Sequence, residues 1–272
     1  MSRENVYWIR DKLKGCIENG WKEERKSALE NKSYCANWDD SKWSGDRTYK
    51  SVFVHVPRTG GTSIGSAIHD YSVKTDHHLA KDIKLKHLYK NFFFYTILRN
   101  PYERMVSIYE YIFREWGYIR KLLAFYQLAQ QTEDISKLFF QLSLPQKQMK
   151  NLITQLPTPT RENFSFERFV NIATEELWDI LWEPQTSFIF DDNDKLIVNY
   201  VGRTETLQKD LECIVQEIEK ISEMKISISS LQQNNKTEKS RVSLLDYFRD
   251  ESTKEKMEKY YEKDIEYLKV KF

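Results

Sequence analysis

The stretch VFVHVPRTGGTSI, residues 52–64, is an apolar strand pattern that runs into a glycine pair, two hydroxyl residues and an apolar helical pattern. Two adjacent glycines let the backbone turn sharply and approach an anion closely, and the N–H groups that open the helix supply positive potential. Arg58 adds a full charge. The stretch therefore predicts a loop between a strand and a helix that binds a phosphate-like group.

The position of the cation bears on which phosphate ligand this loop takes. The ATP-binding pattern G-x-x-x-x-G-K-S/T needs a lysine directly before the hydroxyl residue, whereas Gly61 precedes Thr62 here. Arg58 comes before the glycines, which places it beside the anion rather than over a terminal phosphate. An ATP-dependent small-molecule kinase is therefore a weaker hypothesis than a protein whose loop binds another phosphate-like group.

A second segment, FFFYTILRNP at residues 92–101, reads as a buried strand followed by Arg-Asn-Pro and a helix. Arg99 stands at the carboxyl end of this strand, and Ser107 lies about two turns along the helix. Ligands of open α/β sheets bind at the carboxyl ends of the strands. We expect both side chains to point into that crevice. Apolar residues recur along the helix at one-face spacing: Met105, Ile108, Tyr109, Ile112, Phe113 and Trp116.

The segments VPRTGGTSI and ILRNPYERMVSIY resemble the sulfotransferases that depend on 3′-phosphoadenosine-5′-phosphosulfate (PAPS). The resemblance is to the branch of Golgi carbohydrate sulfotransferases and their soluble bacterial relatives, and WEPQTSFI (182–189) and VGRTETL (201–207) fit it too. Together these motifs span roughly residues 51–272. Together with the strand and helix patterns, the resemblance predicts an α/β fold: a three-layer, P-loop-like domain with a central parallel sheet and mostly helical additions.

The resemblance also implies roles for individual residues. The first loop of the family holds the 5′-phosphosulfate, and an arginine and a serine of the second segment hold the 3′-phosphate. Carried over, the first group becomes Arg58, Thr59, Gly60, Gly61, Thr62 and Ser63, and the second becomes Arg99 and Ser107. Arg203 follows a glycine at an apparent strand end, where it would contact the nucleotide or form a structural ion pair. Arg58 replaces the usual lysine, so it would act by charge and hydrogen bonding.

The predicted chemistry is an in-line displacement that moves a sulfuryl group from PAPS to a hydroxyl or amine and releases 3′-phosphoadenosine-5′-phosphate (PAP). Arg58 would stabilise the leaving phosphate, and a histidine, largely neutral near pH 7, suits the base. We assign that role to His78, because DHHLAKDI (76–83) resembles the His-Leu-Thr-Ala segment of bacterial members. His77 and His55 are the alternatives. Many relatives carry a histidine where this chain has Leu181. His78→Ala should lower turnover about a hundredfold.

Composition limits the partners and the compartment. Lys and Arg total 42 against 41 Asp and Glu, so no global field draws the chain to nucleic acid. The DDND run at 191–194 lacks the glycine and distal glutamate of a calcium loop, and we expect no metal requirement. The sequence contains no membrane-crossing apolar run. Three widely spaced cysteines favour a reducing compartment, so we expect a cytoplasmic enzyme.

The chain is predicted to have two parts. Residues 1–50 contain four of the seven tryptophans and would form an aromatic extension packed on the catalytic domain, residues 51–272. Within that domain, 120–180 reads as a helical insertion that shapes the acceptor site. The expected acceptor is a small natural product, because a long anionic glycan would call for a basic surface. A glycan O-sulfotransferase and a nucleotide-binding module without catalysis are the alternatives; the oligomeric state stays open.

Overall fold

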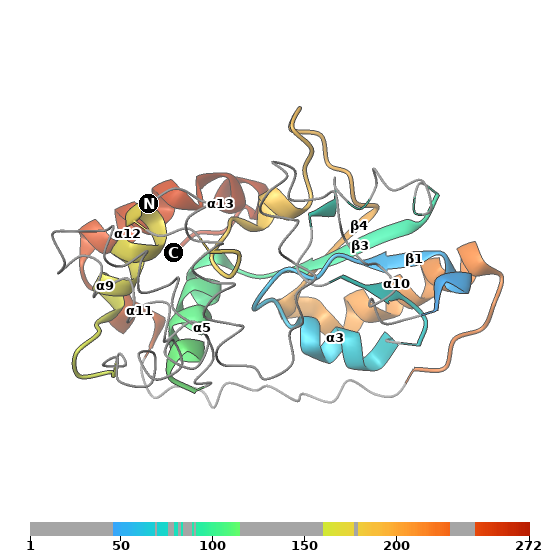
Figure 1. Cartoon of the computed structure of the whole chain (residues 1–272), viewed down its shortest axis with the longest axis horizontal. Coiled ribbons are helices and arrows are strands. Elements are labelled where there is room, and N and C mark those ends of the chain that lie inside the picture. Colours follow the sequence, from blue (N-terminus) through green and yellow to red (C-terminus); the bar gives the residue numbers. More distant parts are fainter. Residues whose placement is uncertain are drawn as a thin grey trace, which may run out of the picture. The chain divides into compact units, whose positions relative to one another are not determined.

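A computed structural model of the chain describes residues 46–68, 70–75, 79–80, 83, 89, 91–114, 160–176, 179–228 and 243–272 (Figure 1). The chain divides into two compact units, one made of residues 38–107 and 180–272 and the other of residues 1–37 and 108–179. Residues 1–45 of the predicted N-terminal extension lie outside the described residues, and so do residues 120–159 and 177–178 of the predicted helical insertion. The domain assignment therefore stays a prediction.

The first unit is built on a four-stranded parallel sheet with the strand order β2-β1-β3-β4 (Figure 1). The strands are β1 (Ser51–Phe53), β2 (Val73–Lys74), β3 (Phe93–Leu98) and β4 (Tyr200–Arg203). All three neighbouring pairs are parallel, so each connection crosses back over the sheet, and α3 (Gly61–Ile68) makes the first of these connections. The predicted α/β fold with a central parallel sheet is confirmed.

The strand β3 is the centre of this sheet because it is apolar on both faces. All six of its residues are buried, and it pairs with β1 on one side and β4 on the other. Strands of parallel sheets that are covered on both faces read as continuous apolar runs, which is how residues 92–98 read in the sequence. Burial of both faces is the property expected of the middle layer in a three-layer α/β arrangement.

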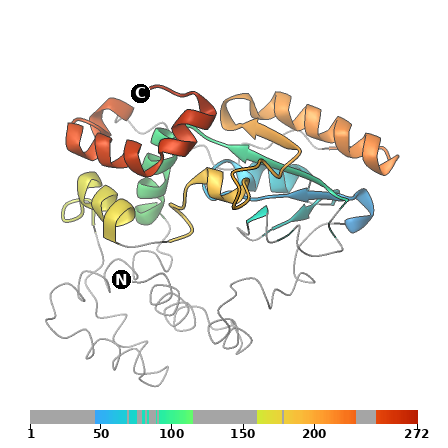
Figure 2. The same ribbon diagram turned by 90° about the horizontal axis from the view of Figure 1, so that it is seen from above.

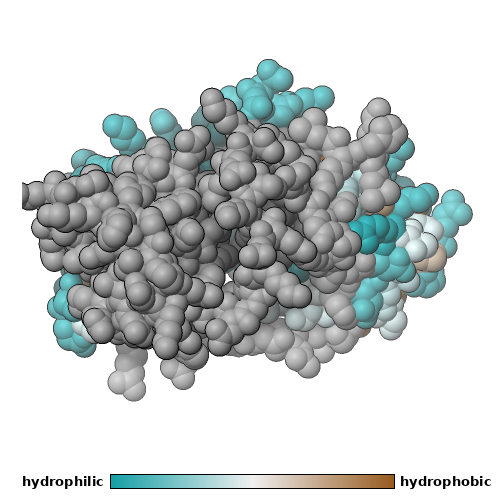
Figure 3. Space-filling model, viewed as in Figure 1, coloured by the Kyte–Doolittle hydropathy of each residue, from teal (hydrophilic) through white to brown (hydrophobic). Residues whose placement is uncertain are grey.

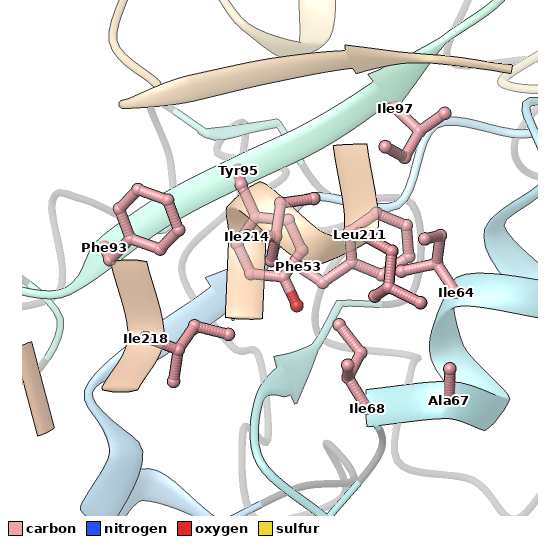
Figure 4. Packing of buried hydrophobic residues seen from close by; sticks show 10 residues of the cluster. All are labelled: Phe53, Ile64, Ala67, Ile68, Phe93, Tyr95, Ile97, Leu211, Ile214 and Ile218. Carbon is pink, nitrogen blue, oxygen red and sulfur yellow. The ribbon is translucent and has the colours of Figure 1, made fainter. Parts of the chain in front are cut away.

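One face of the sheet packs against α3 and α10 (Leu207–Ser222) in a single hydrophobic cluster (Figure 4). Alternate strand residues supply one side of the cluster, and residues three and four apart on the two helices supply the other. This packing fixes the start of α3 above the end of β1. The cluster consists of Phe53, Ile64, Ala67, Ile68, Phe93, Tyr95, Ile97, Leu211, Ile214 and Ile218.

The C-terminal helices lie at the carboxyl ends of β3 and β4 (Figure 2). They are α11 (Leu244–Tyr247), α12 (Glu251–Tyr260) and α13 (Glu262–Leu268). The Tyr102 hydroxyl donates to the Glu258 carboxylate on α12 at 2.6 Å. Short 3₁₀ helices complete this unit: Arg47–Tyr49, Gln185–Phe188 and Thr204–Thr206. The edge of the sheet where ligands are expected is thus bordered by helices from the end of the chain.

The helix α5 (Pro101–Arg114) follows β3 and continues into the second unit. In that unit Tyr109 stacks edge-to-face on Phe113 and Phe166, with ring centroids 5.0 and 5.3 Å apart, and its hydroxyl donates to the Phe164 carbonyl at 2.8 Å. Phe166 opens α9 (Phe166–Asn171), which continues as a π-helical turn, Ile172–Glu176. Aromatic side chains of α5 and of residues 164–169 therefore form the core of the described part of this unit.

Where described residues are visible in Figure 3, most of them are hydrophilic (teal). Among the residues that the structure describes, the exposed large apolar side chains are Leu196, Leu245 and Phe272. Within the same ranges, no helix combines the length and the apolar character needed to cross a membrane.

Candidate functional site

The loop between β1 and α3 has the form of an anion cradle. Arg58 and Gly60 both adopt left-handed backbone conformations, with φ of 67° and 81°, which turns the chain sharply before the helix. The N–H groups of Ser63 and Ile64 donate to the Gly60 carbonyl at 3.0 and 3.2 Å. The N–H groups at the very start of the helix, those of Gly61 and Thr62, have no partner inside it. They therefore supply the positive end of the helix to a ligand.

Thr59 has a structural part in this loop. Its side chain is fully buried, and its hydroxyl donates to the Val56 carbonyl at 3.0 Å. This bond closes the turn from within, as hydroxyl residues often do in loops. Thr59 thus shapes the cradle, while Thr62 and Ser63 lie at its surface.

Gly61 is required because His55 lies directly against it. A Cβ atom on Gly61 would come within 2.0 Å of both Cδ2 and Nε2 of His55, a separation that non-bonded atoms do not reach. The imidazole also stacks on Phe53, with ring centroids 5.6 Å apart, and the His55 N–H donates to the Thr75 hydroxyl at 3.2 Å. These contacts give His55 the role of supporting the loop from the side of the sheet.

The structure brings Arg58 and Ser107 together, although 49 positions separate them. The guanidinium donates to the Ser107 hydroxyl from Nη2 at 3.2 Å and from Nε at 3.4 Å. Ser107 is only 5% exposed and lies on α5, while Arg58 belongs to the loop after β1. A cation assigned to one phosphate site and a hydroxyl assigned to the other are therefore direct neighbours.

Arg99 lies at the carboxyl end of β3, as predicted, and its side chain is 22% exposed. Its Nε donates to the Glu103 carboxylate at 3.2 Å, one turn along α5. Its backbone is held by Gln185, whose amide accepts from the Arg99 N–H at 2.9 Å and donates to the Arg99 carbonyl at 2.8 Å. The Asn100 side chain accepts from the Tyr102 N–H at 3.0 Å and so caps the helix.

Arg203 is placed differently from the other two arginines. Its Nη2 donates to the Leu268 carbonyl at the end of α13 at 2.8 Å, where a cation also meets the negative end of the helix. Its N–H donates to the Asp210 carboxylate at 2.8 Å. These contacts tie Arg203 to α13 and α10, and its assignment to the nucleotide stays a prediction.

Two buried charged residues at this site were not among the predicted residues. Arg104 is fully buried, and its three nitrogens donate to the carbonyls of Pro57, Leu181 and Glu183 at 2.9, 2.9 and 3.0 Å. The signal available in the sequence was its spacing, since 104, 108 and 112 fall on one face of the helix. Asp264, on α13, is equally buried and had no such signal.

Two tyrosines at the site remain neutral donors. Burial raises the pKa of Tyr261 well above its ordinary value, and its hydroxyl donates to the Trp182 carbonyl at 2.7 Å. Burial and the hydrogen bond to Glu258 raise the pKa of Tyr102. Neither phenol is therefore suited to accept a proton near neutral pH. His77 and His78 lie outside the described residues, so their assignment as base stays a prediction.

Comparison with known proteins identifies the family. The family model described as "Sulfotransferase family" matches residues 45–270, which is most of the chain. The chain belongs to the sulfotransferase family. No curated protein and no solved structure matches it individually. Members of this family transfer sulfuryl groups, so the chain is a transferase of this type.

Proposed function

We propose that this sulfotransferase takes its sulfuryl group from PAPS and transfers it to a hydroxyl or amine of a small acceptor, with release of PAP. The observation that carries the proposal is the contact between Arg58 and Ser107 at 3.2 Å. It places the helix-start cradle beside the β3 edge that bears Arg99, so that two phosphate groups of one nucleotide would find cations and hydroxyls a short distance apart.

The residues present fit such a donor. Gly61 has no side chain that would collide with His55, so the loop can turn tightly into the helix start, where an anion would meet backbone N–H groups. Arginine forks match phosphate oxygens better than a point charge does, and Arg58 and Arg99 supply two. We assign the 5′ group to the loop of residues 58–63, and the 3′-phosphate to Arg99 and Ser107.

Each residue then has a task in the transfer. When bound, PAPS supplies an activated sulfuryl group whose bond to the 5′-phosphate oxygen breaks as the acceptor oxygen or nitrogen bonds to sulfur. Arg58 and the N–H groups of Gly61 and Thr62 stabilise the charge that builds on the phosphate. The acceptor proton goes to a base, for which we propose His78. This cytoplasmic reaction needs no metal in our proposal.

The acceptor that we propose is a small natural product rather than a long glycan. The formal net charge of +1 leaves no general attraction for a polyanion. The segment at residues 120–180 would then shape the acceptor pocket, since added elements vary over a rigid scaffold. A glycan hydroxyl is the alternative, and a screen of both acceptor classes with PAPS separates them.

Calorimetric titration tests the donor. The wild type should bind PAP and bind ADP and ATP with magnesium much more weakly, because only PAP carries the 3′-phosphate. Arg99→Ala should lose most of the PAP affinity, and Arg249→Ala, which removes only an exposed arginine paired with Asp246, should keep it. Preference for ATP would indicate a kinase. PAP binding without turnover of any acceptor would indicate a nucleotide-binding module.

A further inference from the structure

The backbone of Arg99 is held by a side chain from a distant part of the chain. Gln185 is fully buried, and its amide makes a pair of hydrogen bonds with the two backbone groups of Arg99, at 2.9 Å to the N–H and 2.8 Å to the carbonyl. The ladder between β3 and β4 ends at Leu98 opposite Arg203. Gln185 thus pairs with the first backbone unit beyond the sheet, in the manner of one more strand residue.

Gln185 is in turn held in place by a buried carboxylate. Asp264, on α13, accepts from the N–H of Gln185 at 2.8 Å and from the N–H and hydroxyl of Thr186 at 2.8 and 2.7 Å. Asp264 is fully buried, so each of these bonds forms away from water and the carboxylate is satisfied by three donors. A buried charge with this many short bonds holds its partners in one arrangement.

The opposite side of the same segment is tied to the phosphate-binding loop. Arg104 bonds the carbonyls of Leu181 and Glu183 together with that of Pro57, directly before Arg58. Residues 181–186 therefore lie between α5 and α13 as a fixed buried spacer. Arg104 links one end to the loop after β1, and Gln185 at the other end contacts the end of β3.

We propose that Gln185, seated by Asp264, is a positioning residue that sets Arg99 for the nucleotide 3′-phosphate, so that α13 is part of the donor-binding machinery. This inference rests on the proposed function. The Arg99 side chain leaves a Cα atom whose own N–H and carbonyl are both bonded by Gln185, while the neighbouring Leu98 carbonyl and Asn100 N–H bond Thr204 and Glu205. Holding the Arg99 N–H and carbonyl fixes the direction in which the side chain leaves the backbone. A small deviation from that direction weakens the two-pronged contact between the guanidinium and a phosphate.

The test compares PAP with AMP, which differ only in the 3′-phosphate. Gln185→Leu keeps the approximate size of the side chain and removes both bonds to Arg99. We expect PAP to bind about tenfold more weakly, equivalent to about 1.4 kcal/mol, while AMP binding changes little. The matched control is Thr253→Val, which removes a buried hydroxyl bond to Asp250 on α12 without contacting Arg99. It should leave the ratio of the two affinities unchanged.

A second variant gives a readout that a loss of stability would not produce. Gln185→Glu keeps the acceptor for the Arg99 N–H but, when ionised, turns a carboxylate oxygen toward the Arg99 carbonyl. Burial and this repulsion raise the pKa of the introduced carboxyl above about 4.3. PAP affinity relative to wild type should therefore recover as the pH falls through that raised pKa. Dividing by wild type at each pH removes the pH dependence that the two proteins share.

Amide hydrogen exchange at Arg99 supplies the readout without any nucleotide. The exchange rate should rise in Gln185→Leu and, to a smaller extent, in Asp264→Asn, and should not rise in Thr253→Val. If wild type prefers PAP over AMP and Gln185→Leu keeps that preference, the positioning role is wrong and the proposed function stands. If wild type shows no preference for PAP, the proposed function fails, and the positioning role is overturned with it.

Discussion

Replacing Arg104 with methionine should destabilise the sheet-containing unit more than any single exposed substitution. The guanidinium is fully buried and donates three hydrogen bonds, to the carbonyls of Pro57, Leu181 and Glu183, at 2.9–3.0 Å. Its Cζ atom lies 5.9 Å from the centroid of the Tyr261 ring. Methionine fills a similar length of space but donates nothing, so three backbone carbonyls lose their buried donor.

The magnitude follows from opposing contributions. Hydrogen bonds to a charged group contribute about 1.5–3 kcal/mol each. The substitution also removes a desolvation penalty of several kcal/mol, because the variant no longer buries a charged guanidinium when it folds. A buried carbonyl that loses its donor costs about 1–3 kcal/mol, and three carbonyls lose the guanidinium, so the net loss is about 3–5 kcal/mol. We expect a loss in this range, which is a large part of the usual 5–15 kcal/mol that holds a domain folded.

Urea unfolding of the wild type and the variant measures this loss as a shift of the transition midpoint at constant slope. Arg104→Lys should give an intermediate loss, because one ammonium cannot reach three carbonyls in different directions. Arg249→Met is the control, since it removes an exposed ion pair with Asp246 that is worth at most about 1 kcal/mol. A loss below about 1 kcal/mol for Arg104→Met would refute the reasoning that this network stabilises the fold.

Three further predictions concern the site itself. Arg58→Ala should lower turnover about a hundredfold or more, because the charge that develops on the leaving phosphate loses its stabilisation. Arg58→Lys should keep most of the turnover, since it keeps the positive charge. Equal rates for the wild type and both variants in a sulfuryl-transfer assay would contradict this prediction. Glu103→Gln should tighten PAP binding a few-fold in a titration, because a carboxylate at 3.2 Å from Arg99 competes with the phosphate, and weaker binding would show that Glu103 orients the arginine instead. Gly61→Ala should abolish PAP binding by colliding with His55, and adding His55→Ala should restore part of it; no restoration would assign the loss to another cause.

The local features of the fold could be predicted from the sequence because their causes lie within a few neighbouring residues. The apolar run at 92–98 indicated a strand buried on both faces, and β3 is one. The glycine pair after an apolar segment indicated a turn into a helix, and α3 begins at Gly61. The position of Arg99 could be predicted in the same way, since a residue directly after a central parallel strand lies at the edge of the sheet where ligands bind.

What the sequence alone determined, then, was the order of strand, loop and helix and the kinds of side chain at each strand end, because apolar periodicity and turn chemistry are local signals. The tertiary structure decided which distant groups meet: Arg58 with Ser107 across 49 positions and Gln185 with Arg99 across 86. It also turned Arg203 toward α13. Such pairings depend on where whole elements cross and on which buried polar groups need a partner, and no short stretch of sequence carries that information.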